Sequence, residues 1–365
     1  MGKILILANN DIGLYKFRRE LIEELLKENE VYISLPDGEF VEQLVNLGCK
    51  FTETIIDRRG MNPIHDFKLI LSYNKIIKRT NPDLVISYTI KPNIYGGLIC
   101  RIRNVKYVAN ITGLGTAFQK EGLLKKFIIN LYRSSLKKSK IVFFENEENQ
   151  NTFVINRIIA NEKTYKLNGA GVNLMEYPFV SYPSENEPIR FLFIGRLMKE
   201  KGIDELLEVA EKIKIINESI QFDIVGPNED EYTKKLLCLQ KKKVVNYFGY
   251  QKNVKPFIEN AHCFVLPSYH EGMANTLLES GAMGRPLITS NIPGCREAVV
   301  EGGNGYLTNV ADSEHLYKIL CKFIELSYES KRKMGSFSRK HIESNFNKYE
   351  VVKETMQILK EYTDN

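Results

Sequence analysis

The sequence lacks several features that mark common protein classes. It has no run of about 18 uncharged apolar residues, so we expect no membrane-spanning helix. Its six cysteines are scattered without a Cys-x-x-Cys pair, which argues against a zinc site and against a secreted disulfide framework. No Gly-x-Gly-x-x-Gly follows the first apolar segment, which argues against a dinucleotide-dependent dehydrogenase.

Two further absences concern metals and targeting. No Asp-x-Asp pair lies at the end of an expected strand, so we expect no catalytic metal and no cofactor. The first residues, MGKILILANND, resemble a buried strand and lack the cleavage site of a signal peptide. We therefore expect a cytoplasmic protein.

What is present indicates two α/β domains. The chain has 365 residues, 43% of them hydrophobic, which suits two domains better than one. Apolar segments alternate with helical patterns in two series, and the series are separated by a polar, proline-rich stretch at residues 177–188. Strands are expected at 4–8, 31–35, 84–88, 106–111 and 141–145, and then at 190–194, 221–225, 244–248, 263–266 and 286–290. We place the domains at 1–180 and 181–347, with a final helix in 348–365.

The basic residues are concentrated in the first half. Residues 1–180 contain 26 Lys and Arg against 19 Asp and Glu, an excess of seven within a total net charge of +6. Many lie in residues 120–140, where Leu123, Leu124 and Phe127 begin a near-helical apolar spacing. This pattern predicts a basic amphipathic helix, and an ordinary solvated helix is the alternative.

The most informative segment is residues 268–286, SYHEGMANTLLESGAMGRP. A buried strand ends just before it and a helix is expected from Asn275 to Met283, so Glu271 lies in a strand-to-helix turn. Free N–H groups at such a helix start attract phosphate. Glu279 lies about two turns further along, which suits opposite ends of one elongated ligand better than a catalytic acid and base pair.

This segment resembles the signature of the retaining glycosyltransferase family 4. The runs FLFIGRLMKEKG at 191–202, FDIVGP at 222–227, PGCRE at 293–297 and GGNGYL at 302–307 complete the family's order of landmarks. The resemblance implies the GT-B fold, in which two Rossmann-like, doubly wound domains face a cleft. The first domain would bind the acceptor, the second would bind the nucleotide sugar, and the final helix would pack back on the first.

The resemblance also implies site residues. The expected catalytic residues are Glu271, which would contact the donor sugar, and Arg196 and Lys201, which would hold the diphosphate because cations stabilise its developing charge without proton transfer. The expected nucleotide-sugar-binding residues are Gly13, Gly195, Gly226, Gly272, Met273, Ala274, Asn275, Thr276 and Glu279, the last of them at the ribose hydroxyls. The expected substrate-binding residues are Asn9, Arg18, Lys91, Thr112, Gly113 and His270.

Residues 110–118, NITGLGTAF, resemble the part of the family that builds bacterial surface glycans on polyprenyl-diphosphate lipids. We therefore expect transfer of a hexose or N-acetylhexosamine, from UDP by preference, to a lipid-linked glycan. Residues 120–140 would meet an anionic membrane surface at the inner face of the cell membrane, and no nucleic-acid partner is expected. Transfer to a soluble acceptor and a nucleotide-binding module without turnover remain as alternatives.

Overall fold

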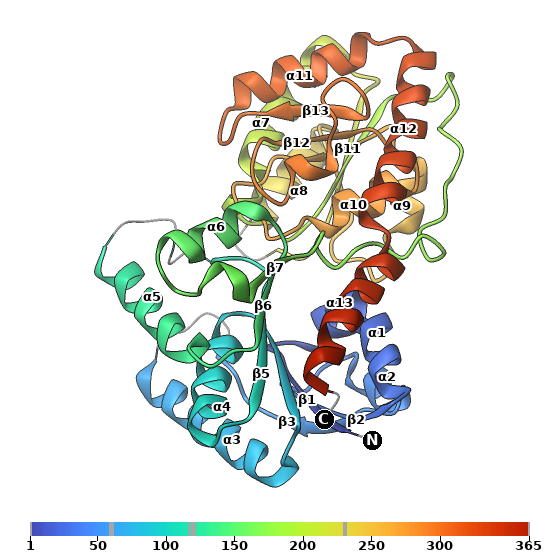
Figure 1. Cartoon of the computed structure of the whole chain (residues 1–365). Helices are drawn as coiled ribbons and strands as arrows, with labels where there is room; N and C mark the ends of the chain where they lie inside the picture. Colours follow the sequence, from blue (N-terminus) through green and yellow to red (C-terminus); the bar gives the residue numbers. More distant parts are fainter. Residues whose placement is uncertain (1, 58–61, 116–117, 119–121, 229–231, 364–365) are drawn as a thin grey trace. The chain divides into compact units, whose positions relative to one another are not determined.

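The computed structural model of the chain describes residues 2–57, 62–115, 118, 122–228 and 232–363 (Figure 1). They form two compact units. Unit 1 comprises residues 1–170 and 348–365, and unit 2 comprises residues 171–347. The first crossing between units therefore comes earlier in the chain than the expected boundary at 180.

Unit 1 is built on a parallel sheet with the strand order β3-β2-β1-β4-β5-β6-β7. Its strands are β1 (Gly2–Leu7), β2 (Asn29–Leu35), β3 (Lys50–Glu53), β4 (Leu84–Tyr88), β5 (Lys106–Ile111), β6 (Ile141–Phe144) and β7 (Thr164–Lys166). Its helices are α1 (Asp11–Leu26), α2 (Val41–Asn46), α3 (Pro63–Thr80), α4 (Gly97–Arg103), α5 (Leu123–Leu136), α6 (Glu147–Ile155) and α13 (Lys348–Thr363).

Two separate hydrophobic clusters cover the two faces of this sheet. Helices α1, α2 and α13 contribute to one cluster, and helices α3, α4, α5 and α6 contribute to the other. Figure 1 shows the same division within unit 1, with α3, α4 and α5 on one side of the strands. This is the doubly wound arrangement expected from the βα alternation.

Unit 2 repeats the architecture with the strand order β10-β9-β8-β11-β12-β13, again parallel. Its strands are β8 (Arg190–Ile194), β9 (Gln221–Val225), β10 (Asn246–Tyr247), β11 (Cys263–Leu266), β12 (Leu287–Ser290) and β13 (Gly305–Thr308). Its helices are α7 (Ile203–Ile216), α8 (Thr233–Lys241), α9 (Lys255–Asn260), α10 (Asn275–Ala282), α11 (Ser313–Glu325) and α12 (Tyr328–Phe346). The two sheets confirm the α/β fold class.

Three short edge strands, β3, β7 and β13, were not expected from the sequence. Their sequences KFTE, TYK and GYLT are too short or too polar to give an apolar run. Strand β13 also depends on a glycine, because a Cβ at Gly305 would lie 1.7 Å from the carbonyl oxygen of Leu287. Only pairing with a neighbouring strand reveals such elements.

The proline-rich stretch 177–188 has no helix or strand, yet it packs on unit 2. The buried guanidinium of Arg285 donates from Nη2 to the carbonyl oxygens of Val180 (3.2 Å) and Ser181 (2.9 Å). The Tyr182 hydroxyl donates to the carbonyl oxygen of His262 at 2.9 Å. The stretch is therefore fixed to unit 2 along its length and is not a free linker.

Helix α13 is anchored to unit 1 by a buried ion pair. Lys348 Nζ lies 3.4 Å from Glu20 Oε2, and the two side chains are only 5% and 6% exposed. The same ammonium donates to the carbonyl oxygen of Lys16 at 3.3 Å. Because α13 also adds Val351, Val352 and Leu359 to the core of unit 1, the ion pair fixes the point where the chain re-enters this unit.

We predict that Lys348→Met destabilises unit 1 by about 3 kcal/mol, because it removes the Lys348 ammonium from the buried Glu20 carboxylate. The midpoint of thermal unfolding should fall by roughly 2–4 °C for each kcal/mol. Lys353→Met, on an exposed pair of the same helix, is the matched control and should leave the midpoint unchanged. An unaltered midpoint in Lys348→Met would show that the pair does not anchor the helix.

Candidate functional site

In unit 2 the predicted site residues lie on loops that follow β8 and β11. These two strands are neighbours, but the strand order reverses between them, and open α/β sheets bind ligands at such a switch point beyond the carboxyl ends of the strands. The loop after β8 carries Arg196 and Lys201, and the loop after β11 carries Glu271. The topology therefore brings together residues that are 70 positions apart in the chain.

Lys201 and Glu271 are in direct contact. Lys201 Nζ donates to Glu271 Oε1 at 2.5 Å, and Ser268 Oγ donates to the same oxygen at 2.8 Å. The side chains of Lys201 and Glu271 are 18% and 11% exposed, so the pair is shielded but still reaches the surface. Ser268 itself is buried and was not predicted as a site residue. Its hydroxyl and the Lys201 ammonium both bind the same carboxylate oxygen of Glu271.

The two loops are pressed together at a glycine. Gly202 has φ +67°, and a Cβ there would lie 2.0 Å from the carbonyl oxygen of Pro267. The Tyr269 N–H donates to the carbonyl oxygen of Glu200 at 2.8 Å, and its hydroxyl donates to Glu205 Oε1 at 2.5 Å. These contacts hold the turn Lys199–Lys201, which presents the Lys201 ammonium to Glu271.

Gly195 and Gly226 have a packing role. Gly226 has φ +147°, and a Cβ there would lie 1.8 Å from the carbonyl oxygen of Gly195. The Gly195 N–H donates to the carbonyl oxygen of Val225 at 3.0 Å. The two glycines let the turns after β8 and β9 touch. Arg196, which follows Gly195, is exposed at this edge.

The start of α10 presents backbone rather than side chains. Met273 and Ala274 are buried in the core of unit 2, so only their main chain can meet a ligand. Ala274, the residue before the helix, has no side chain that could cap it. The side chains of Asn275 and Thr276 are half-buried. The turn is held by Gly294, where a Cβ would lie 2.3 Å from the carbonyl oxygen of Gly272.

Glu279, on α10, faces a residue that the sequence did not single out. Burial raises the pKa of Tyr177, and the negative charges of Glu279 and Glu176 and a hydrogen bond with Glu279 act in the same direction. Tyr177 belongs to the proline-rich stretch described above, and the Lys255 ammonium lies 5.8 Å from its ring centroid. The structure thus places an aromatic side chain beside the predicted ribose-binding carboxylate.

His270 precedes Glu271 and is exposed. Desolvation lowers the pKa of His270, while the charges of Glu200 and Glu271 oppose the shift. A neutral imidazole beside the carboxylate suits hydrogen bonding to a sugar better than it suits holding a phosphate.

In unit 1 the corresponding switch point lies between β1 and β4. Asn9 and Gly13 follow β1, where the side chain of Asn10 accepts from the Gly13 N–H at 2.6 Å and donates to Asn9 Oδ1 at 2.7 Å. A Cβ at Gly13 would lie 2.9 Å from Asn10 Oδ1. Gly13 therefore has a local role in capping α1.

Arg18 forms a shielded ion pair. Its Nη2 donates to Glu145 Oε1 at 2.6 Å, and the two side chains are 10% and 12% exposed. The guanidinium also lies 5.0 Å from the ring centroid of Tyr88, at the end of β4. Arg18, Glu145 and Tyr88 come from three separate parts of the chain, and only the fold brings them together.

Lys91 forms an ion pair with α3. Its Nζ donates to Asp66 Oδ1 at 2.7 Å, and the Tyr95 hydroxyl donates to Asp66 Oδ2 at 2.9 Å. Just before Lys91, Thr89 has φ +74°, which is strained for a β-branched residue. Its buried hydroxyl has no hydrogen-bond partner among the described residues. Backbone strain and an unsatisfied hydroxyl at a strand end are typical of functional sites.

Thr112 and Gly113 follow β5, and Gly113 has φ +149°. They adjoin a buried polar network in which Asn93 Nδ2 donates to the carbonyl oxygen of Asn110 at 2.8 Å and Ser87 Oγ donates to Asn93 Oδ1 at 2.5 Å. The network fixes the turn after β4 against β5.

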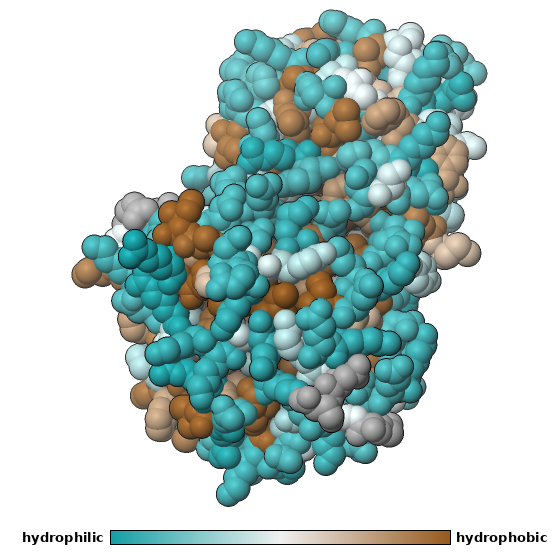
Figure 2. Space-filling model, in the orientation of Figure 1, coloured by the Kyte–Doolittle hydropathy of each residue, from teal (hydrophilic) through white to brown (hydrophobic). Residues whose placement is uncertain are grey.

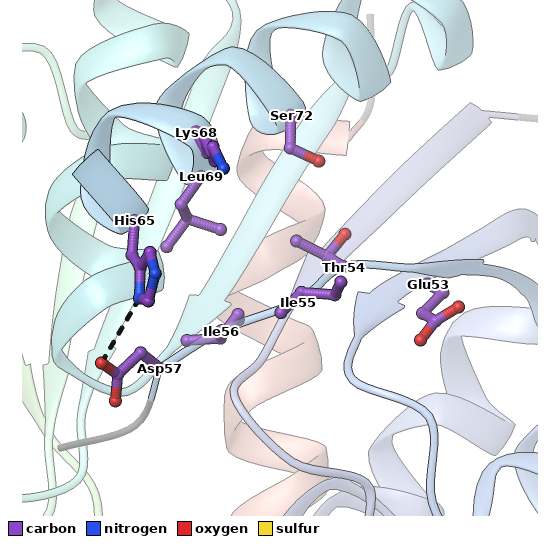
Figure 3. Close-up of a pocket in the computed structure, with 9 residues that line it drawn as sticks. All are labelled: Glu53, Thr54, Ile55, Ile56, Asp57, His65, Lys68, Leu69 and Ser72. Atoms are coloured by element: carbon purple, nitrogen blue, oxygen red, sulfur yellow. Dashed lines mark ion pairs between the residues drawn. The ribbon is translucent and has the colours of Figure 1, made fainter. Parts of the chain in front are cut away.

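A cavity of about 590 Å³ lies in unit 1 and was not predicted (Figure 3). Figure 3 shows it between the chain leaving β3 and the first turns of α3, with His65 pointing toward Asp57. His65 Nδ1 lies 3.7 Å from Asp57 Oδ2. The residues that line the cavity are Glu53, Thr54, Ile55, Ile56, Asp57, His65, Lys68, Leu69 and Ser72. The volume falls in the range of small-molecule sites.

The described residues contain no group of three or more His, Cys, Asp or Glu side chains that could hold a metal ion. The sequence-based expectation of catalysis without a metal stays a prediction. Within the same residues, no helix is both long enough and apolar enough to cross a bilayer.

Comparison with known proteins gives two family matches. Residues 179–341 match the model "Glycosyl transferases group 1", and residues 3–146 match the model "Glycosyl transferase 4-like". Each match lies entirely within one unit of the structure. Together the two models cover most of the chain.

Two curated relatives are similar over much of their length. The N,N'-diacetylbacillosaminyl-diphospho-undecaprenol alpha-1,3-N-acetylgalactosaminyltransferase of Campylobacter jejuni is 27% identical over 340 residues, which cover 88% of this chain and 89% of the relative. The UDP-Gal:alpha-D-GlcNAc-diphosphoundecaprenol alpha-1,3-galactosyltransferase of Escherichia coli is 25% identical over 285 residues, or 72% of each chain.

Solved structures agree on the fold. A glycosyltransferase from Rickettsia africae has a TM-score of 0.78 at 19% identity, with 100% of this chain and 99% of that chain covered. Anabaena Alr3699/HepE in complex with UDP-glucose has a TM-score of 0.79 at 16% identity, with 99% and 100% covered. The chain therefore belongs to the group 1, family 4-like glycosyltransferases and has their two-domain GT-B fold.

Proposed function

We propose that the protein is a retaining glycosyltransferase that moves a hexose or N-acetylhexosamine from a nucleotide diphosphate sugar, preferably a UDP sugar, to a polyprenyl-diphosphate-linked glycan. The product would enter a surface polysaccharide or another surface glycan. The observation that carries the proposal is the contact of Lys201 and Ser268 with Glu271 at the switch point of unit 2. The names of the two curated relatives support the lipid-linked acceptor, and the second names a UDP donor.

The residues of unit 2 suit a leaving diphosphate. As the bond between the anomeric carbon and the phosphate oxygen breaks, negative charge builds on the diphosphate, and fixed cations stabilise it. The Lys201 ammonium has three N–H donors, and one of them binds Glu271, so two remain for phosphate oxygens. Arg196 can add a bidentate contact. Glu271 would then hold the donor sugar, and Glu279 the ribose hydroxyls.

Retention of the anomeric configuration follows from attack on the same face of the sugar. The acceptor oxygen forms the new bond to the anomeric carbon on the side from which the diphosphate departs, and its proton passes to a phosphate oxygen. This step needs neither an enzyme nucleophile nor a metal.

Unit 1 would bind the acceptor. The cavity lined by α3 and residues 53–57 offers carboxylates, hydroxyls and an apolar floor, which suit the hydroxyls and ring faces of a glycan. Lys91 is linked to it through Asp66, the neighbour of the cavity residue His65. We assign the acceptor glycan to this edge of unit 1, with Asn9, Arg18, Thr112 and Gly113 as further contacts.

Residues 120–140 would meet an anionic membrane surface at the cytoplasmic face of the cell membrane. Leu123, Leu124 and Phe127 are 86%, 42% and 56% exposed on α5, and Lys126 is exposed among them. Lys120, which is part of the predicted basic helix, lies outside the described residues. Arg133 is used locally, because its Nη2 donates to the carbonyl oxygen of Asn156 at 2.6 Å. Transfer to a soluble acceptor would leave this apolar surface without a role.

We predict that Lys201→Ala lowers the rate of sugar transfer about 100- to 1,000-fold, because it removes one cation from the developing diphosphate. Lys199→Ala, in the same turn but exposed, is the matched control and should keep most of the activity. The measurement is release of nucleotide diphosphate with lipid-linked acceptor present. Wild-type protein that binds nucleotide without any turnover would support the nucleotide-binding module instead.

We also predict that UDP raises the midpoint of thermal unfolding more than GDP or ADP does. At 100 times the dissociation constant, a ligand stabilises the folded protein by about 2.7 kcal/mol. Glu279→Gln should weaken binding of UDP at least tenfold if this carboxylate holds the ribose. Glu325→Gln, on the exposed face of α11, is the control. Equal shifts with all three nucleotides would argue against a preference for UDP.

Transfer should continue in the presence of EDTA at a rate within about twofold of the untreated enzyme, because Arg196 and Lys201 supply the positive charge that a divalent ion would otherwise supply. A rate that falls with EDTA and returns with Mg²⁺ or Mn²⁺ would contradict catalysis without a metal. The same initial-rate assay of nucleotide release serves for this measurement.

A further inference from the structure

Helix α3 of unit 1 has an exposed apolar stripe. Ile64, Phe67 and Leu71 are 65%, 60% and 51% exposed. Their spacing of three and four residues places them on one side of the helix. The opposite side is buried in the core of unit 1 through Leu69, Tyr73, Ile76 and Ile77. The stripe is therefore not needed for packing α3 on its sheet.

The same side of α3 carries three lysines. Lys68, Lys75 and Lys78 are all exposed. At about 100° per residue, Lys78 falls within the helical arc of Phe67, Leu71 and Ile64, and the other two lie within about 40° of its edge. Asp66, the only acidic residue of α3, lies outside this arc, where it pairs with Lys91 and Tyr95. The exposed face of the helix thus combines apolar side chains with positive charge and has no compensating acid of its own.

The stripe lies on the same sheet face as the exposed apolar residues of α5. Leu69 of α3, Ile99 of α4 and Ile129 of α5 belong to one hydrophobic cluster, so the three helices cover one face. Both α3 and α5 follow strands of a parallel sheet, which directs their N-terminal ends toward its carboxyl edge. Figure 2 shows hydrophobic atoms at the surface over α3 and α5, among hydrophilic ones.

We propose that the exposed face of α3 is a second membrane-binding element. Ile64, Phe67 and Leu71 would enter the headgroup and acyl boundary of an anionic bilayer, while Lys75 and Lys78 bind lipid phosphates. An interfacial helix needs this combination of aromatic and aliphatic residues with flanking lysines. Two helices with apolar N-terminal ends would hold the carboxyl edge of the sheet at the lipid surface.

This inference rests on the proposed function, because a lipid-linked acceptor gives unit 1 a reason to lie on a membrane. The two can fail separately. Stabilisation by UDP tests the donor site, and vesicle binding by α3 variants tests the membrane face. A wild-type protein without UDP stabilisation would remove the proposed function and leave the vesicle result to stand.

The test is co-sedimentation of the full chain with vesicles of phosphatidylcholine alone or with about 30% phosphatidylglycerol. Wild-type protein should bind the anionic vesicles and should be released by salt. Phe67→Ser/Leu71→Ser should weaken this binding at least tenfold. Lys75→Gln/Lys78→Gln should weaken binding to anionic vesicles by a similar factor and leave binding to neutral vesicles unchanged.

The matched control is Ile215→Ser/Ile216→Ser, which alters exposed apolar residues at the end of α7 in unit 2 and should bind vesicles like the wild type. Unchanged thermal midpoints and UDP stabilisation would show that the α3 variants are folded. If both α3 variants sediment with anionic vesicles as the wild type does, the proposal is wrong. A second outcome would also overturn it. If the wild type does not bind vesicles but self-associates, and Phe67→Ser/Leu71→Ser abolishes that self-association, the face binds a second copy of the chain.

Discussion

The contact between Lys201 and Glu271 depends on the reversal of strand order between β8 and β11. Neighbouring strands whose chains run off in opposite directions leave a gap at their carboxyl ends, and the loops that follow them converge there. The fit is tight enough that Gly202 must lie against the carbonyl oxygen of Pro267 without a side chain. A shielded lysine and carboxylate therefore meet where the fold favours an anionic ligand, and Ser268 fixes their geometry.

Unit 1 uses the same topology for a different chemistry. At its switch point the charged side chains are already paired with one another, Arg18 with Glu145 and Lys91 with Asp66. The strained Thr89, with its unsatisfied hydroxyl, follows β4 and lies two residues before Lys91. A neutralised edge with hydroxyl, carboxylate and apolar groups suits a glycan better than a diphosphate. Helices α3 and α5 carry exposed lysines that accompany exposed apolar side chains.

Most central strands could be predicted, since β4, β5, β8, β9 and β11 have the expected bounds. Each is an apolar run that is buried on both faces, and such runs are visible in a sequence. The edge strands β3, β7 and β13 were missed because their pairing, not their composition, defines them. The basic amphipathic pattern of residues 120–140 was recognised, but its apolar residues were not separated into those that pack, such as Leu136, and those that stay exposed, such as Leu123.

The sequence by itself determined the family, the two-domain α/β class and the positions of the conspicuous charged residues, because motif order and apolar periodicity are local properties of a chain. The tertiary structure decided which of these residues touch. The partners Ser268 of Glu271, Glu145 of Arg18 and Asp66 of Lys91 belong to contacts that strand order creates. The tertiary structure also decided which side of α3 is exposed, since a helix buries only the side that packs on its sheet.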